Sequence, residues 1–197
     1  MRGLCNQLTN CVDGTPVALS CILEERNEKS TTNNQYEVLS STIKGMCTQR
    51  EYFSKDIASA NNVGYKVVKL NDIVLSPQNL WMGNINYNDC FDIGIVSPSY
   101  KVYKINSSYD KTFMAYLLKS HRALYNYMMV SEQGASIVRR NLNLELFEQL
   151  IFKLPSLEKQ RKVGRLLSKI NKQLNLANNQ LSMYEKQKQY LLQKMFI

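Results

Sequence analysis

The C-terminal forty residues carry an apolar repeat that constrains the fold more than any other feature of the chain. Steps of four and three residues, taken alternately from position 163, reach an apolar side chain everywhere except at Lys188. These steps have a mean period of about 3.5 residues, which is typical of a helix that packs along another helix in a left-handed supercoil. The predicted interface residues are Val163, Leu167, Ile170, Leu174, Ala177, Leu181, Tyr184, Leu191 and Met195.

The length of this helix separates the chain into two parts. A helix over 156–195 would be about 60 Å long at about 1.5 Å per residue. A domain built from the other residues is too small to enclose it, so we expect the helix to project and to need a partner helix. The sequence thus predicts a globular domain over 1–155 and a coiled-coil helix over 156–197.

The positive charge of the chain is concentrated in the same helix. The formal net charge is +9, from 25 basic and 16 acidic residues. Residues 156–197 hold nine basic and two acidic side chains, a net of +7, which leaves +2 for residues 1–155. A solvated helix usually mixes the two signs, whereas one-sided basic charge favours contact with nucleic acid or an acidic partner.

Composition limits the class of protein. No apolar run reaches the roughly 18 residues that a membrane-spanning helix needs, and the N-terminus lacks the apolar stretch of a signal peptide. The five cysteines are odd in number and show no C-x-x-C spacing. They are typical of reduced thiols in a cytoplasmic protein, and we expect no membrane contact.

The first 155 residues predict an α+β fold with several short strands. We expect residues 1–16 to be irregular, with strands at 36–39, 66–70, 72–75, 94–96, 100–105 and 150–154. Asp110 is expected to cap one helix that runs to about Met129, and a short helix should cover 144–149. Ser156 is the expected N-cap of the long helix.

The sequence does not assemble a catalytic site. His121, the only histidine, is expected in the middle of a helix on the surface. Phosphate-binding glycine loops and metal-ligand spacings are absent from the sequence. The segment Ser97-Pro98-Ser99-Tyr100 is similar to the signature of amino-methyltransferases, but Ser99 replaces a proline and no glycine-rich cofactor loop precedes it. We therefore expect a non-catalytic chain that binds no metal or cofactor.

Three polar stretches with aromatic residues are candidates for DNA contact. Lysine and arginine would bind phosphates, whereas amide and aromatic side chains would read base edges or offer flat contact area. The expected phosphate contacts are Lys44, Arg50, Lys55, Arg139 and Arg140. The expected base-reading residues are Gln49, Asn79, Trp81, Asn84 and Tyr87, with Tyr52 beside them.

Several segments together resemble the specificity (S) subunits of type I restriction-modification systems. The segment 154–163, LPSLEKQRKV, and the ending LLQKMF at 191–196 are similar to that family's coiled-coil spacer. Asn71-Asp72-Ile73-Val74 resembles its GDIV segment, with Asn71 in place of glycine, and 94–102, GIVSPSYKV, resembles its GIVSPAYxV segment. Residues 134–150 fit its approach to the spacer. The resemblance covers residues 70–197 well and the first 70 loosely.

The resemblance implies a DNA-recognition subunit rather than an enzyme. S subunits of this family read double-stranded DNA through two recognition domains held apart by long helices. Methylation subunits, which use S-adenosylmethionine to methylate adenine at N6, dock on them, and ATP- and Mg²⁺-dependent restriction subunits join the complex. This chain resembles half of such a subunit, with one recognition domain and one spacer helix.

Three arrangements of this half remain open from the sequence. Two copies could pair their helices antiparallel and form a two-fold dimer that reads a symmetric site. The chain could instead pair with a different half, or be part of a longer product. A coiled-coil adaptor that touches DNA without sequence preference is the alternative function.

Overall fold

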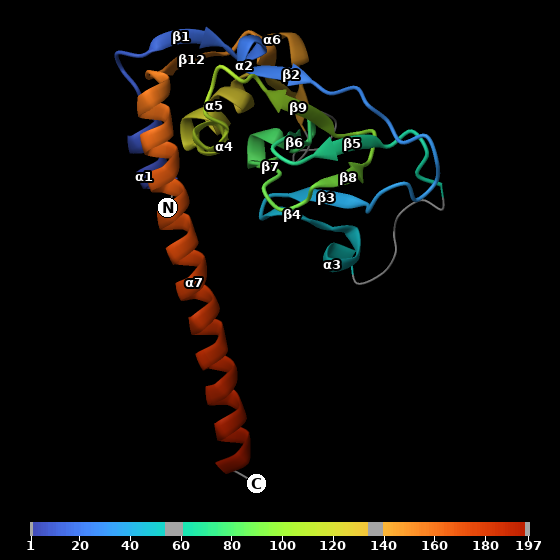
Figure 1. Ribbon diagram of the computed structural model, residues 1–197, viewed down its shortest axis with the longest axis vertical. Coiled ribbons are helices and arrows are strands. Elements are labelled where there is room, and N and C mark those ends of the chain that lie inside the picture. The colour runs from blue at the N-terminus through green and yellow to red at the C-terminus, as the bar shows by residue number, and fades with distance from the viewer. Residues whose placement is uncertain (1, 54–60, 134–139, 196–197) are drawn as a thin grey trace.

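The protein consists of a globular α+β part and one long helix that runs out of it (Figure 1). The computed structural model describes residues 2–53, 61–133 and 140–195. In chain order the elements are α1 (Arg2–Thr9), β1 (Thr15–Ala18), α2 (Leu19–Ile22), β2 (Leu23–Glu25), β3 (Leu39–Thr42), β4 (Gly45–Thr48), α3 (Gln49–Phe53), β5 (Lys66–Lys69), β6 (Ile73–Leu75), the 3₁₀ turn η1 (Leu80–Met82), β7 (Ile85–Tyr87), β8 (Ile93–Val96), β9 (Lys101–Ile105), α4 (Lys111–Leu118), α5 (His121–Met129), β10 (Ser131–Gln133), β11 (Arg140–Leu142), α6 (Leu144–Glu148), β12 (Ile151–Leu154) and α7 (Leu157–Met195).

A four-stranded antiparallel sheet, in the order β2-β9-β6-β7, lies at the centre of the globular part. Successive side chains of a strand point to opposite faces, so each strand contributes to two layers. Ile73 and Tyr103 pack in the larger core, against residues of α4, α5 and α6 such as Phe113 and Phe147. Val74, between Ile73 and Leu75 on β6, packs instead in a smaller core.

The smaller core lies between the central sheet and two two-stranded sheets, β5-β8 and β3-β4. Leu39 of β3 packs in it so tightly that a Cβ on Gly94 would meet the Leu39 Cδ1 atom at 2.4 Å. The glycine of the GIVSP segment is therefore required by close packing. The strands expected at 94–96 and 100–105 are confirmed as β8 and β9.

The predicted helix from Asp110 to Met129 is wrong in one respect, because the structure has two helices there. Asp110 accepts a hydrogen bond from the Phe113 backbone N at 2.8 Å, as a helix cap. Ser120 then caps a second helix, accepting from the Ala123 N at 3.3 Å. His121 is consequently the first residue of α5 rather than a mid-helix residue.

The N-terminal segment, predicted to be irregular, begins with helix α1. Cys5 of α1 is buried, and the Thr9 hydroxyl donates to the Cys5 carbonyl at 2.6 Å. The helix packs against α4, α5 and α7. Its apolar face is too short to give a clear period in the sequence, so packing decides its conformation.

The short connection between β5 and β6 explains why asparagine can stand at position 71, where the GDIV segment that residues 71–74 resemble has glycine. Asn71 has φ +73°, a left-handed conformation that favours glycine and that asparagine tolerates better than most residues. The next residue, Asp72, is buried and accepts from the Arg26 Nε at 2.7 Å and from the Lys69 backbone N at 2.8 Å. The turn is thus fixed by a buried ion pair. The strands on either side pair in different sheets.

The first turns of α7 pack against the globular part. Gln160, which is buried, accepts from the Asp110 N at 3.1 Å and donates to the Pro155 carbonyl at 2.9 Å. Ser156 accepts from the Lys159 N at 3.4 Å, which agrees with its predicted capping role. From residue 172 onward every described side chain is exposed, so about 36 Å of helix projects, at about 1.5 Å per residue. In the described part of the chain, no helix combines the length and apolar character that a bilayer crossing requires.

Candidate nucleic-acid interface

A cleft of about 750 Å³ lies between the β3-β4 hairpin and η1. Four of the predicted DNA-contacting residues line it, although they come from separate parts of the sequence. They are Lys44, Tyr52, Asn79 and Asn84. The remainder of the lining is Ser40, Ser41, Thr42, Ile43, Gly45, Met46, Cys47, Glu51, Met82 and Tyr100.

A reciprocal cap fixes the start of α3 on one side of this cleft. The Thr48 hydroxyl accepts from the Glu51 N at 3.2 Å, and the Glu51 carboxylate accepts from the Thr48 N at 2.9 Å. This arrangement, in which a threonine and a glutamate three residues later each satisfy a backbone N–H, is the capping box. Gln49 and Arg50 lie between them and Tyr52 follows, so all three are presented from the first turn of a capped helix. The motif T-Q-R-E in the sequence is the signal that would have predicted this helix.

Trp81, predicted to read bases, and Arg140, predicted to bind a phosphate, meet at η1. The Arg140 guanidinium lies 5.4 Å from the centre of the Trp81 ring, at cation–π distance. The Arg140 backbone N donates to the Gln78 carbonyl at 3.4 Å, which brings β11 beside the loop before η1. Lys55 and Arg139, which were predicted to bind phosphates, lie outside the described residues.

Two buried atoms of the predicted base-reading residues lack a hydrogen-bond partner within the described chain. They are the Gln49 Oε1 acceptor and the Trp81 Nε1 donor. Buried polar atoms in folded proteins are almost always satisfied, so such atoms are candidates for contact with a ligand or an ordered water. A third such atom, the Tyr103 hydroxyl, belongs to a residue of the larger core that was not predicted to contact DNA.

Asn84 is a structural residue rather than an exposed reader of bases. It is only 6% exposed; its amide donates to the Ser41 carbonyl at 3.0 Å and its carbonyl accepts from the Ser41 hydroxyl at 2.7 Å. Both polar atoms of the side chain are therefore occupied within the protein. Its prediction as a base-reading residue is not supported by this geometry, because the chemistry of an amide side chain does not show which partners within the protein already occupy it.

Tyr87 is also held inside the protein. It is partly buried, and its hydroxyl donates to the Asn71 Oδ1 atom. Burial raises the pKa of Tyr87 to about 12, so the phenol remains neutral at physiological pH. The residue supports the turn at Asn71 and contributes little free surface to DNA.

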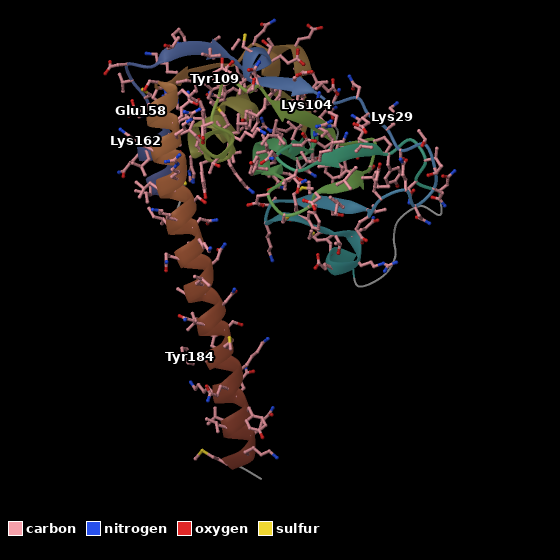
Figure 2. All side chains as sticks on the ribbon, in the orientation of Figure 1. Lys29, Lys104, Tyr109, Glu158, Lys162 and Tyr184 are labelled. Carbon is pink, nitrogen blue, oxygen red and sulfur yellow. The ribbon has the colours of Figure 1, made fainter. Side chains whose placement is uncertain are left out.

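The predicted coiled-coil residues fall into two groups on α7. Leu167 has no exposed surface and Val163 packs partly buried against the larger core, so these two positions are covered by the chain's own globular part. Ile170 is intermediate, and the positions from Leu174 onward are exposed. Tyr184 is one of these exposed positions and lies well beyond the globular part (Figure 2). The exposed Glu158–Lys162 ion pair, by contrast, lies beside the globular part.

A second apolar stripe runs along the projecting part of α7. Leu176, Met183 and Tyr190 are spaced seven residues apart and are all exposed. Leu176 follows Leu174 by two residues, which places it about 200° further around the helix at about 100° per residue. This stripe was not predicted from the sequence, although its heptad spacing indicates it. The projecting helix therefore offers two separate apolar faces.

Comparison with solved structures identifies the fold. The chain superposes on the type I restriction-modification S subunit from M. genitalium with a TM-score of 0.55 and 14% sequence identity, over 86% of this chain and 42% of that one. It also superposes on a chain from a structure that addresses assembly and conformational transition of the type I R-M system, with a TM-score of 0.53 and 15% identity, over 85% of this chain and 40% of that one.

These likenesses confirm, at the level of the fold, the resemblance to S subunits inferred from the sequence. No family model and no curated protein matches the sequence. The chain spans about two-fifths of the length of the S-subunit chains that it matches.

Proposed function

We propose that the chain is a DNA-recognition part of a type I restriction-modification specificity subunit and has no catalytic activity of its own. The observation that carries the proposal is the S-subunit fold, which the sequence resemblance and the structural comparison support independently. The cleft beside the β3-β4 hairpin is the part of this fold that we assign to DNA. It gathers cationic, amide and aromatic side chains, which are the types that contact phosphates and bases.

Within this site we assign separate roles to the cationic residues and to the amide and aromatic ones. Lys44 and Arg50 are exposed at the hairpin turn and at the start of α3, where they would bind phosphates and fix the register on the duplex. Gln49, Asn79 and Trp81 would contact base edges, with Arg140 stacked on Trp81. Together they would read one part of a two-part site.

The helix α7 would carry the protein partners. Its seam from Ile170 to Met195 would pair antiparallel with a second long helix, and a second copy of this chain would then place two recognition domains at opposite ends. Another half-subunit, or a further segment of the same protein, could provide that second helix instead. The stripe of Leu176, Met183 and Tyr190 leaves a second face on which methylation subunits could dock.

Cofactors would belong to those partner subunits. S-adenosylmethionine would be bound by the methylation subunits, and ATP and Mg²⁺ by the restriction subunits. This chain would contribute sequence specificity and geometry alone.

A map of N6-methyladenine tests the function. Cells that carry the cognate methylation subunit are compared with and without this chain. A palindromic two-part motif that depends on the chain would support a homodimer, and an asymmetric one would support pairing with a different half. Absence of any chain-dependent motif, in a complex shown to assemble, would refute the proposal.

Helix pairing is tested by two matched substitutions. Leu174 lies in the seam and Leu176 lies outside it, and they are 42% and 49% exposed. Replacing either with glutamate therefore removes a similar area of exposed apolar surface from the unpaired chain. In the chain measured without methylation subunits, Leu174→Glu should disrupt pairing and lower the assembled mass, whereas Leu176→Glu should leave the pair intact. Equal masses for the two variants would contradict pairing through the seam.

The alternative function is a coiled-coil adaptor that binds DNA without sequence preference. The net charge of +7 on residues 156–197 favours it, because such a helix alone attracts phosphates. An adaptor would bind every duplex with similar affinity and steep salt dependence. A specificity subunit would still bind its preferred site at salt concentrations that abolish binding to other duplexes.

A further inference from the structure

The β3-β4 hairpin, which carries Lys44 at its turn, forms a two-stranded sheet of its own. In the described part of the chain, its strands pair with each other, and the residue before β3, Val38, adds a single bridge to Ile95. Backbone pairing therefore does not join the turn of the hairpin to the central sheet. Its orientation must depend on side chains.

A buried polar network supplies this connection, centred on Ser41. The Ser41 carbonyl accepts from the Asn84 amide and, at 3.2 Å, from the Tyr100 hydroxyl. The Ser41 hydroxyl donates to Asn84 and accepts from the Asn86 Nδ2 at 2.8 Å. Ser41, Asn84 and Asn86 are each less than a tenth exposed. Hydrogen bonds in such surroundings are costly to break, because the freed groups cannot turn to water.

Asn86 extends the network from the hairpin to helix α4. On β7 its side chain points to the hairpin, while its neighbours Ile85 and Tyr87 point to the larger core. Its Nδ2 also donates to the Thr42 carbonyl at 2.7 Å, one residue before the turn. Its Oδ1 accepts from the ammonium of Lys119, the C-cap residue of α4, at 2.6 Å. A cation thus orients the amide that holds the hairpin.

We propose that Asn86 and Lys119 are positioning residues that fix the angle of the β3-β4 hairpin against the central sheet, and thereby determine sequence discrimination rather than overall affinity for DNA. The proposal rests on the proposed function of the cleft. Neither residue has to touch DNA for this role. Lys119 orients Asn86, and Asn86 orients the backbone on which Lys44 is carried.

The anchoring is tested first on the chain without DNA. Lys119→Met removes the ammonium and keeps most of the side-chain length. Lys111→Met, at the other end of the same helix, is exposed and removes the same charge as a control. In Lys119→Met we expect amide hydrogen exchange over 41–47 to become about tenfold faster, while exchange over 73–75 and 101–105 is unchanged. Equal exchange of the hairpin in the two variants would overturn the anchoring.

The second test uses the assembled methylation complex and the motif of the wild-type chain. With Lys119→Met, the ratio of methylation at cognate sites to sites with one changed base should fall about tenfold. Affinity for unrelated duplex should stay within about twofold of the Lys111→Met control. An equal loss at all sites would mean a structural role only, and would refute the claim about specificity.

A second variant, Asn86→Asp, keeps the shape of the side chain but turns the donor at Ser41 and Thr42 into an acceptor. It should relax the same position of the motif as Lys119→Met, because both act through the hairpin. Relaxation at different positions would overturn the shared mechanism. If the wild-type complex shows no chain-dependent motif, the proposed function fails and the specificity claim fails with it, whereas the exchange experiment still decides the anchoring.

Discussion

Replacement of Gly164 by alanine distinguishes helix propensity from tertiary packing. Gly164 lies inside α7, where the helix crosses the start of α4. Propensity alone predicts that alanine would stabilise this helix by about 1 kcal/mol. The structure predicts the opposite sign.

The reason is the close approach of the two helices. A Cβ on Gly164 would lie 2.7 Å from the Asp110 Oδ1 atom and 3.0 Å from the Phe113 backbone N. These two atoms form the N-cap hydrogen bond of α4, so the methyl group would meet the cap itself. Relief requires either that α7 shifts or that the Asp110 side chain turns away.

Overpacking of this kind costs about 2 kcal/mol, within a usual range of about 1–3 kcal/mol. Loss of a helix cap costs about 1 kcal/mol more. Against the gain of about 1 kcal/mol in propensity, we expect a net destabilisation of about 2 kcal/mol. For a chain of this size that corresponds to a melting temperature lower by about 4–8 °C.

Urea unfolding followed by circular dichroism measures this difference. Ser168→Ala is the control, because Ser168 is exposed on the same helix and only propensity should act there. We expect Ser168→Ala to be neutral or slightly stabilising. A Gly164→Ala variant at least as stable as the wild type would refute the close approach of α7 and α4.

Three further predictions concern the turn between β5 and β6. Asp72→Asn breaks the buried ion pair with Arg26 and should lower the free energy of unfolding by about 3 kcal/mol, whereas Lys162→Ala, which removes an exposed pair, should change it by less than about 0.5 kcal/mol in urea titrations. Asn71→Ala and Asn71→Gly both lose the hydrogen bond from Tyr87, but we expect the alanine variant to be less stable than the glycine variant by about 1–2 kcal/mol, because φ is positive at position 71. Equal stabilities of the two variants would contradict the left-handed backbone conformation at this residue. Burial raises the Tyr87 pKa to about 12, so between pH 10 and 12 the unfolded chain loses a proton that the folded chain keeps, and the free energy of unfolding should fall as pH rises. Unfolding measurements at pH 9 and 12 should show a smaller fall for Tyr87→Phe than for the wild type. An identical fall in the two proteins would contradict the burial of Tyr87.

Much of the local structure follows from short-range patterns in the sequence. The strands at 94–96 and 100–105, the cap at Asp110 and the cap at Ser156 were all predicted, because each depends on neighbouring residues. The capping box at Thr48 could have been predicted in the same way. The break at Ser120 could have been as well, because Ser120 caps α5 by accepting from the backbone N of Ala123, three residues on. Helix α1 could not, since packing against other helices decides it.

The assembly of the site was beyond the sequence. Residues near 44–52, at 79–81 and at 140 were chosen separately for their chemistry, and only the tertiary fold brings them together around η1. The same fold removes Asn84 from the set by satisfying both of its polar atoms with Ser41. Side-chain type shows what a residue can bind, but the long-range contacts of the chain determine whether it is free to do so.

The sequence by itself determined that the chain ends in one long helix with an apolar seam, because a period of about 3.5 residues is a local property of the helix. Only the tertiary structure decided where that seam is covered. Leu167 is fully buried where α7 packs against α4, and the exposed seam continues from Leu174. A periodic pattern defines which side chains share a face, whereas the surface that buries them belongs to residues distant in the sequence, so the boundary between intramolecular core and free interface appears only when the chain is folded.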